Sequence, residues 1–204
     1  MKNPQPADYP VNQDIRFQPT KVYYHQNNGG FSVSLAIYDI TDKVKVTDPV
    51  YLEDAKSLSS GVNPALEIRQ ESWHTRNYKA FGRAGAVVAE ASGPLLDLGR
   101  WKIKFPAESV HSTHDLELRP TGPGRRQDVF VLESVPYFWD MVDPKGVYKL
   151  YKVDMGLRVE VANFTSKSHR DLEGVLIVND KEVGGVVAIV TSIAVLKRDD
   201  SFRK

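Results

Sequence analysis

Three basic residues alternate with three apolar residues in the stretch "RWKIKF" at positions 100–105. Side chains two residues apart share one face of a β-strand, so the tryptophan, isoleucine and phenylalanine would face a core. Arg100, Lys102 and Lys104 would then line the outer face, and Arg125 and Arg126 would add charge from a nearby loop. Such a surface could hold lipid phosphates or an anionic membrane. The other interpretation is a solvated face that acidic residues balance.

His111 and His114 form a second candidate, because histidines three residues apart can share a helix face and bind a metal. They lie in "SVHSTHD", which reads as a loop between strands. We favour surface loop histidines over an adventitious zinc or nickel site, and we expect neither a metal nor a cofactor.

Catalytic signatures are missing from the sequence. There is no G-x-S-x-G motif, and "TGPGRRQ" lacks the spacing of a phosphate-binding P-loop, so it is interpreted as a hairpin loop. The acid pairs Glu71 and Glu90, or Asp140 and Asp143, cannot be brought together without a fold. We therefore expect a protein that is not an enzyme.

The composition is that of one folded domain. The chain has 204 residues, 41% of them hydrophobic, a net charge of +1 and no cysteine, which excludes disulfides and thiol chemistry. Nucleic acid is not an expected partner at this charge. Residues 1–19 include Pro4, Pro6 and Pro10 and have no signal peptide, which predicts a flexible tail and a cytoplasmic protein, with peripheral membrane attachment left open. Residues 20–198 would form the domain, and residues 199–204 a charged tail.

Short strands dominate the rest of the chain. Alternating or β-branched segments recur at regular spacing from residue 21 to residue 178, with turn residues between them. Residues 44–57 are ambiguous, with a turn at Asp48-Pro49 and either a strand or a short helical piece beside it. This pattern predicts a mainly β fold of about 10–12 strands, an antiparallel barrel or a sandwich.

The segment from Val183 to Leu196 carries no charge over fourteen residues. A membrane span needs about 20 apolar residues, and one strand of this length would extend about 46 Å, across an entire domain of about 43 Å. A helix would be about 21 Å long. Asn179 with Glu182 matches a capping box, so we predict a helix at about residues 180–197. A helix that is apolar all round is buried all round, as inside a closed barrel.

The C-terminal third resembles the tubby C-terminal-like superfamily, which includes tubby domains, phospholipid scramblases and LURP-one-related proteins. The similar stretches are "VPYFWDM", "VYKLYKV", "LRVEVANFTSK" and "DLEGVLIVNDKEVGGVVAIVTSIAVLKR". They are closest to small fungal members without an assigned function. The resemblance implies a twelve-stranded barrel around the hydrophobic helix, and no phosphoinositide-binding motif is matched residue by residue.

The resemblance and the basic alternation together predict a non-enzymatic barrel that binds anionic phospholipid or phosphoinositide at a membrane surface, without a transmembrane span. Two alternatives stay open. One is a protein-interaction or structural barrel without a small ligand, and the other is a sugar-binding or hydrolytic β-sandwich.

Overall fold

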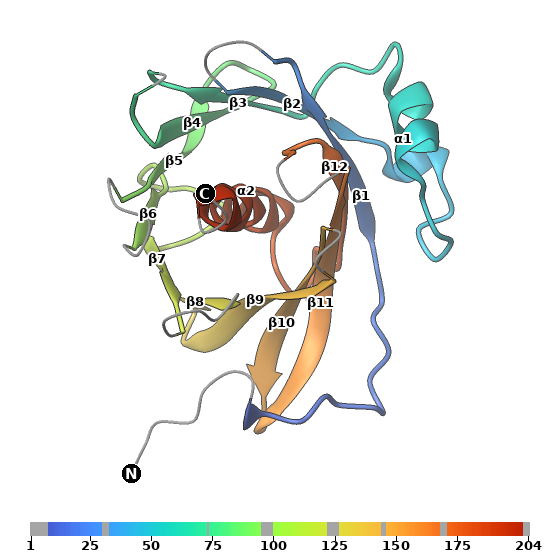
Figure 1. Ribbon diagram of the computed structural model, residues 1–204, viewed down its shortest axis with the longest axis vertical. Coiled ribbons are helices and arrows are strands. Elements are labelled where there is room, and N and C mark those ends of the chain that lie inside the picture. The colour runs from blue at the N-terminus through green and yellow to red at the C-terminus, as the bar shows by residue number, and fades with distance from the viewer. Residues whose placement is uncertain are drawn as a thin grey trace.

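The computed structural model describes residues 8–29, 33–72, 74–94, 100–121, 127–143, 146–167 and 171–201. Each strand pairs antiparallel with its neighbours in the sequence, and the first strand also pairs with the last, so the sheet closes into a barrel (Figure 1). The strands are β1 (Lys21–Asn27), β2 (Ser34–Asp39), β3 (Leu66–Gln70), β4 (Asn77–Gly82), β5 (Val87–Ser92), β6 (Trp101–Lys104), β7 (Leu116–Pro120), β8 (Gln127–Leu132), β9 (Val135–Asp143), β10 (Val147–Asp154), β11 (Leu157–Ser166) and β12 (Gly174–Val178). This closed antiparallel barrel confirms the predicted fold class and excludes the β-sandwich.

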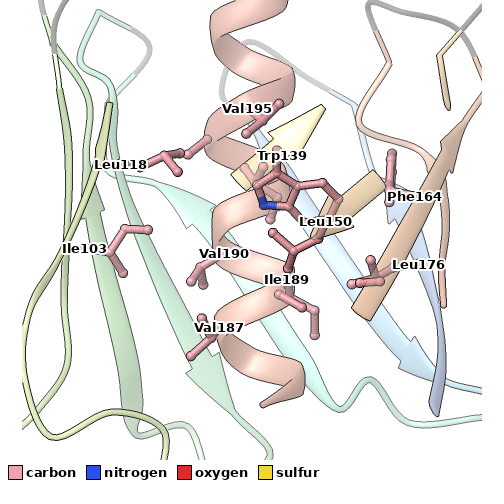
Figure 2. Close-up of a cluster of buried hydrophobic side chains, with 14 of the residues drawn as sticks. Ile103, Leu118, Trp139, Leu150, Phe164, Leu176, Val187, Ile189, Val190 and Val195 are labelled. Atoms are coloured by element: carbon pink, nitrogen blue, oxygen red, sulfur yellow. The ribbon is translucent and has the colours of Figure 1, made fainter. Parts of the chain in front are cut away.

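The helix α2 (Gly185–Ser201) runs through the middle of the barrel, and in Figure 1 it is seen end-on inside the ring of strands. Val187, Ile189 and Val190 are at most 4% exposed although they point in different directions from the helix axis (Figure 2). Strand residues such as Ile103 and Leu176 meet them from opposite walls. The buried helix predicted from the uncharged segment is therefore confirmed.

The start of this helix differs from the prediction. Asn179 does not cap it, because its carbonyl and side-chain oxygens accept bonds from the next few amides and close a turn, among them Glu182 N at 3.0 Å. The helix begins at Gly185, whose amide donates to Asp180 Oδ1 at 2.5 Å. A Cβ on Gly185 would lie 2.5 Å from the Tyr23 hydroxyl oxygen, so a glycine permits this close entry into the barrel.

Hydroxyl groups on the buried helix have partners. Thr191 Oγ1 donates to the carbonyl of Val187 at 2.8 Å and accepts from Trp139 Nε1 at 3.0 Å, while Ser192 Oγ donates to the carbonyl of Ile189 at 2.8 Å. A buried hydroxyl without a hydrogen bond would cost about 1–3 kcal/mol. These bonds let a polar pair of residues lie inside an apolar core.

A second, smaller core lies outside the barrel. The helix α1 (Leu52–Ser59), preceded by the short 3-10 helix η2 (Thr41–Lys43), covers the outer side of β1 and β12 (Figure 1). Ala55 of α1 belongs to a buried cluster with Val22, Tyr24 and Val175. The alternate residue Tyr23 faces the interior core, which explains why β1 is apolar on both faces.

The segment before β1 contacts the barrel near Arg158 of β11. The amide of Arg158 donates to the carbonyl of Pro10, and the amide of Asn12 donates to the carbonyl of Arg158, both at 2.9 Å. Val11 and Arg158 form a parallel bridge. None of the helices in the described ranges has both the length and the apolar character that a membrane crossing needs.

Candidate functional site

Strand β6 presents its basic residues to solvent, as the alternation predicted. Trp101 and Ile103 are 1% and 0% exposed and belong to the interior core, while the residues between and beside them are exposed. Arg100, Lys102 and Lys104 therefore lie on the outer surface. In Figure 1 this strand is on the opposite side of the barrel from α1.

Acidic residues on the neighbouring strands divide these cations into paired and unpaired ones. Arg100 Nη1 lies 2.9 Å from Glu117 Oε1 of β7 and forms an ion pair with it. Lys102 is opposite Glu117 in the strand register and Lys104 is opposite Glu90 of β5. No described residue forms an ion pair with Lys102 or Lys104, so their ammonium groups are open to a ligand.

Lys79 of β4 holds Glu71 and Glu90, a pair of acids that the sequence could not bring together. Its Nζ lies 2.9 Å from Glu71 and 3.6 Å from Glu90. The hydrogen bond to Glu71 raises the pKa of Lys79, and the same bond lowers the pKa of Glu71. Two carboxylates thus flank one ammonium group and form an ion-pair network with it.

Arg119 of β7 joins this surface and was not part of the predicted patch. Leu116 and Leu118 of this strand are buried, so Glu117 and Arg119 point outward. Leu118 is opposite Trp101, which places Arg119 beside Arg100. Arg119 is exposed and has no ion-pair partner among the described residues. The alternation in "LELRP" was the signal that would have found it.

We call this surface the basic face. It comprises five cations and three carboxylates, namely Lys79, Arg100, Lys102, Lys104, Arg119, Glu71, Glu90 and Glu117. Its net charge is therefore +2. Of these five cations, three have no ion pair with a described residue, namely Lys102, Lys104 and Arg119. Next to them on β8, Val131 is 48% exposed and adds an apolar side chain.

Arg125 and Arg126, the other two predicted site residues, lie outside the described residues. The strands on either side of their loop, β7 and β8, pair antiparallel as the predicted hairpin requires. Their contribution to the basic face stays a prediction.

The two histidines lie in the loop between β6 and β7, as expected from the sequence. Burial lowers the pKa of His111, with an opposing effect from Asp180. His114 Nε2 lies 3.4 Å from the carbonyl oxygen of Val131. The described residues contain no cluster of three or more histidine, aspartate or glutamate side chains that could hold a metal.

The geometry of the basic face suits anion binding. Its open ammonium and guanidinium groups offer donors to phosphate or carboxylate oxygens, and its carboxylates are engaged with cations or opposite them. A comparison with protein-family models, with curated proteins and with solved structures found no match.

Proposed function

We propose that this protein is a non-enzymatic barrel that binds anionic phospholipid at a membrane surface through the basic face. The observation that carries the proposal is the group of three exposed cations without an ion pair in the described residues, Lys102, Lys104 and Arg119, on two adjacent strands. The exposed side chain of Val131 beside them could enter the interfacial region of a bilayer.

The filled interior supports a function on the outer surface. The helix α2 occupies the middle of the barrel, and Trp139, Leu150 and Phe164 pack around it with no exposed area (Figure 2). The helix thus fills the space inside the barrel that a ligand would otherwise occupy. A ligand would therefore bind on the outer surface of the barrel, where the charged side chains are.

The resemblance to the tubby C-terminal-like superfamily supports the same proposal, because the expected barrel around a hydrophobic helix is also the arrangement described above. We extend the proposal to membership of that superfamily. A phosphorylated headgroup, such as that of a phosphoinositide, would place several phosphate oxygens near the open cations.

The size of the effect follows from membrane electrostatics. A basic residue near an anionic membrane surface contributes about 1 kcal/mol, so three residues contribute about 3 kcal/mol, or roughly a hundredfold in affinity. Salt screens such contacts, with a Debye length of about 8 Å at physiological ionic strength. Membrane binding should therefore weaken as the salt concentration rises.

Vesicle flotation tests the proposal. Wild-type protein should float with vesicles that contain phosphoinositide and should not float with phosphatidylcholine vesicles alone. The triple variant Lys102/Lys104/Arg119→Ala should lose roughly a hundredfold in apparent affinity. A control with the same change of charge, Lys45/Lys56/Lys181→Ala, replaces exposed lysines outside the basic face and should bind as wild type does. Equal binding by the two triple variants would rule the proposal out.

A protein-interaction barrel is the second candidate, and exposed apolar side chains favour it. Met155 is 97% exposed, Val110 is 93% exposed and Tyr51 is 70% exposed. A protein partner would remove these apolar side chains from water, which is favourable. Light scattering that gives a mass well above 22.9 kDa in the absence of lipid would support this alternative.

A further inference from the structure

A pocket of about 460 Å³ lies on the outside of the barrel, where β3 and β4 approach the turn to β5. This volume is within the usual range for small-molecule sites, about 300–1,000 Å³. The side chains that line it are Asn63, Pro64, Glu67, Arg69, Phe81 and Arg83. None of them belongs to the basic face.

Arg69 is held in place within this pocket by two contacts. Its Nη2 donates to Oε2 of Glu67, and its guanidinium carbon lies 5.2 Å from the centre of the Phe81 ring. Glu67 and Phe81 are directly opposite each other in the register of β3 and β4. The guanidinium group is thus oriented before any ligand binds, while its other N–H groups have no acceptor among the described residues.

Arg83 supplies a second guanidinium group from the turn between β4 and β5. The backbone of this turn is closed by its own hydrogen bonds, from Gly85 N to the carbonyl of Gly82 at 2.8 Å and from Gly82 N to the carbonyl of Ala86 at 2.9 Å. The Arg83 side chain is exposed and forms no ion pair with a described residue. Its donors are therefore available to a ligand in the pocket.

Glu67 makes the pocket unsuitable for a ligand that is only anionic. Its Oε2 accepts from Arg69, but its Oε1 accepts no hydrogen bond from a described residue. A compact dianion such as phosphate would be repelled by this carboxylate. A ligand with a donor next to its own carboxylate would satisfy both signs of charge, because the donor would bind Glu67 and the carboxylate would bind the arginines.

We propose that this pocket binds a small molecule with a carboxylate and an adjacent ammonium or hydroxyl group, that is, an α-amino acid or α-hydroxy acid with an apolar side chain. The carboxylate pairs with Arg69 and Arg83, and the ammonium or hydroxyl group donates to Oε1 of Glu67. The apolar part packs against Pro64 and Phe81. This site goes beyond the proposed membrane function, since it uses none of the three open cations of the basic face.

Nuclear magnetic resonance titration tests the site with defined probes. Saturable shifts of the Arg69 and Arg83 side-chain Nε–H signals are expected with L-leucine or with 2-hydroxy-4-methylpentanoate. The probe with the higher affinity, called the preferred acid below, shows whether the group that donates to Glu67 is an ammonium or a hydroxyl group. L-Leucinamide lacks the carboxylate and 4-methylpentanoate lacks the donor, so each should bind at least tenfold more weakly. Inorganic phosphate should also bind more weakly than the preferred acid.

Two variants assign the roles of the residues, with folding checked by an unchanged melting temperature. Arg83→Gln should weaken the preferred acid at least fivefold. Glu67→Gln should weaken the same acid but should not weaken 4-methylpentanoate, because that probe makes no bond to Glu67 and is no longer repelled by a carboxylate. Lys102→Gln, on the basic face, should bind every probe as wild type does.

Three outcomes would overturn the proposal. The first is the absence of saturable shifts, and the second is binding of leucinamide or phosphate as tight as that of the preferred acid. The third is an equal loss of affinity for the preferred acid and for 4-methylpentanoate in Glu67→Gln. Vesicle flotation is independent of these results, since the variants at Lys102, Lys104 and Arg119 leave the pocket intact. Failure of one proposal can therefore be told from failure of the other.

Discussion

Trp139 Nε1 donates a hydrogen bond of 3.0 Å to Thr191 Oγ1, and both side chains are completely buried. The bond joins β9 in the barrel wall to the middle of α2. Because the surrounding core is apolar, neither group has water to replace a lost partner. This contact fixes the rotation of the helix as well as adding to stability.

Removing either partner of this bond should lower the free energy of unfolding by more than the hydrogen bond itself contributes, because the remaining group stays buried without a partner. Thr191→Val keeps the shape but leaves the indole N–H buried without an acceptor, which costs about 1–3 kcal/mol. Trp139→Phe should cost more, because it also leaves a void. Urea denaturation of both single variants and the double variant measures the coupling, which we expect to be about 1 kcal/mol. Strictly additive losses would show that the bond contributes nothing.

Ile189 tests the burial of α2. Its side chain is 1% exposed at the centre of the core (Figure 2). Ile189→Asp places a charge where neither water nor a cation can reach it, so we expect a loss of several kcal/mol and an unfolded chain. Ile189→Val, which removes one methylene group, should cost about 0.5–1.5 kcal/mol. A folded aspartate variant with the melting temperature of wild type would mean that the helix is not enclosed.

His25 should make stability depend on pH in the acidic range. Its side chain is 0% exposed, its ring centre lies 5.0 Å from that of Phe164, and burial lowers its pKa to about 3. Below about pH 6.5 the unfolded chain binds a proton at this position and the folded chain does not. The free energy of unfolding should therefore fall by up to about 1.4 kcal/mol for each pH unit between 6.5 and 3.

The variant His25→Leu isolates this contribution. Leucine has a similar volume and cannot titrate, so the difference in unfolding free energy between variant and wild type should grow as the pH falls. Denaturation curves at pH 7, 6, 5 and 4 would measure it. A difference that stays constant over this range would contradict a neutral, buried His25.

Two glycines form a matched pair for the packing of the barrel. A Cβ on Gly174 would lie 2.5 Å from Phe164 Cζ and 2.5 Å from the carbonyl oxygen of Thr165, whereas a Cβ on Gly184 would meet nothing within 4 Å. Gly174→Ala should therefore destabilise the protein by about 1–3 kcal/mol or more, since a backbone atom would have to move. Gly184→Ala should change the melting temperature little. Equal effects of the two substitutions would contradict the described contact of β12 with β11.

Much of the fold followed from patterns that short segments carry by themselves. The alternation in β6 predicted which residues are buried, and the length of the uncharged segment distinguished a helix from a strand or a membrane span. The start of α2 did not follow, because Asn179 suits a helix cap and a tight turn equally well. The chain reversal from β12 into the barrel selects the turn.

The candidate site was less predictable, because its charges depend on the register between strands. Lys102 and Lys104 stay open because the acids opposite them pair with other cations, Glu117 with Arg100 and Glu90 with Lys79, and this choice requires the strand order. The alternation in "LELRP" was enough to predict that Arg119 faces outward. The pocket could not be predicted in this way, since Glu67 and Phe81 are brought together by the register of β3 with β4.

The most direct test of the membrane proposal asks which face of the barrel meets the bilayer. The chain contains no cysteine, so a single introduced cysteine can carry an environment-sensitive fluorophore. Ser92 is exposed and opposite Lys102 on the basic face, and Ser57 is exposed on α1, on the other side of the barrel. With phosphoinositide-containing vesicles, the emission of the label at Ser92→Cys should shift to the blue, while that at Ser57→Cys should stay unchanged. An unchanged emission at position 92, or a shift at position 57 alone, would contradict membrane binding through the basic face.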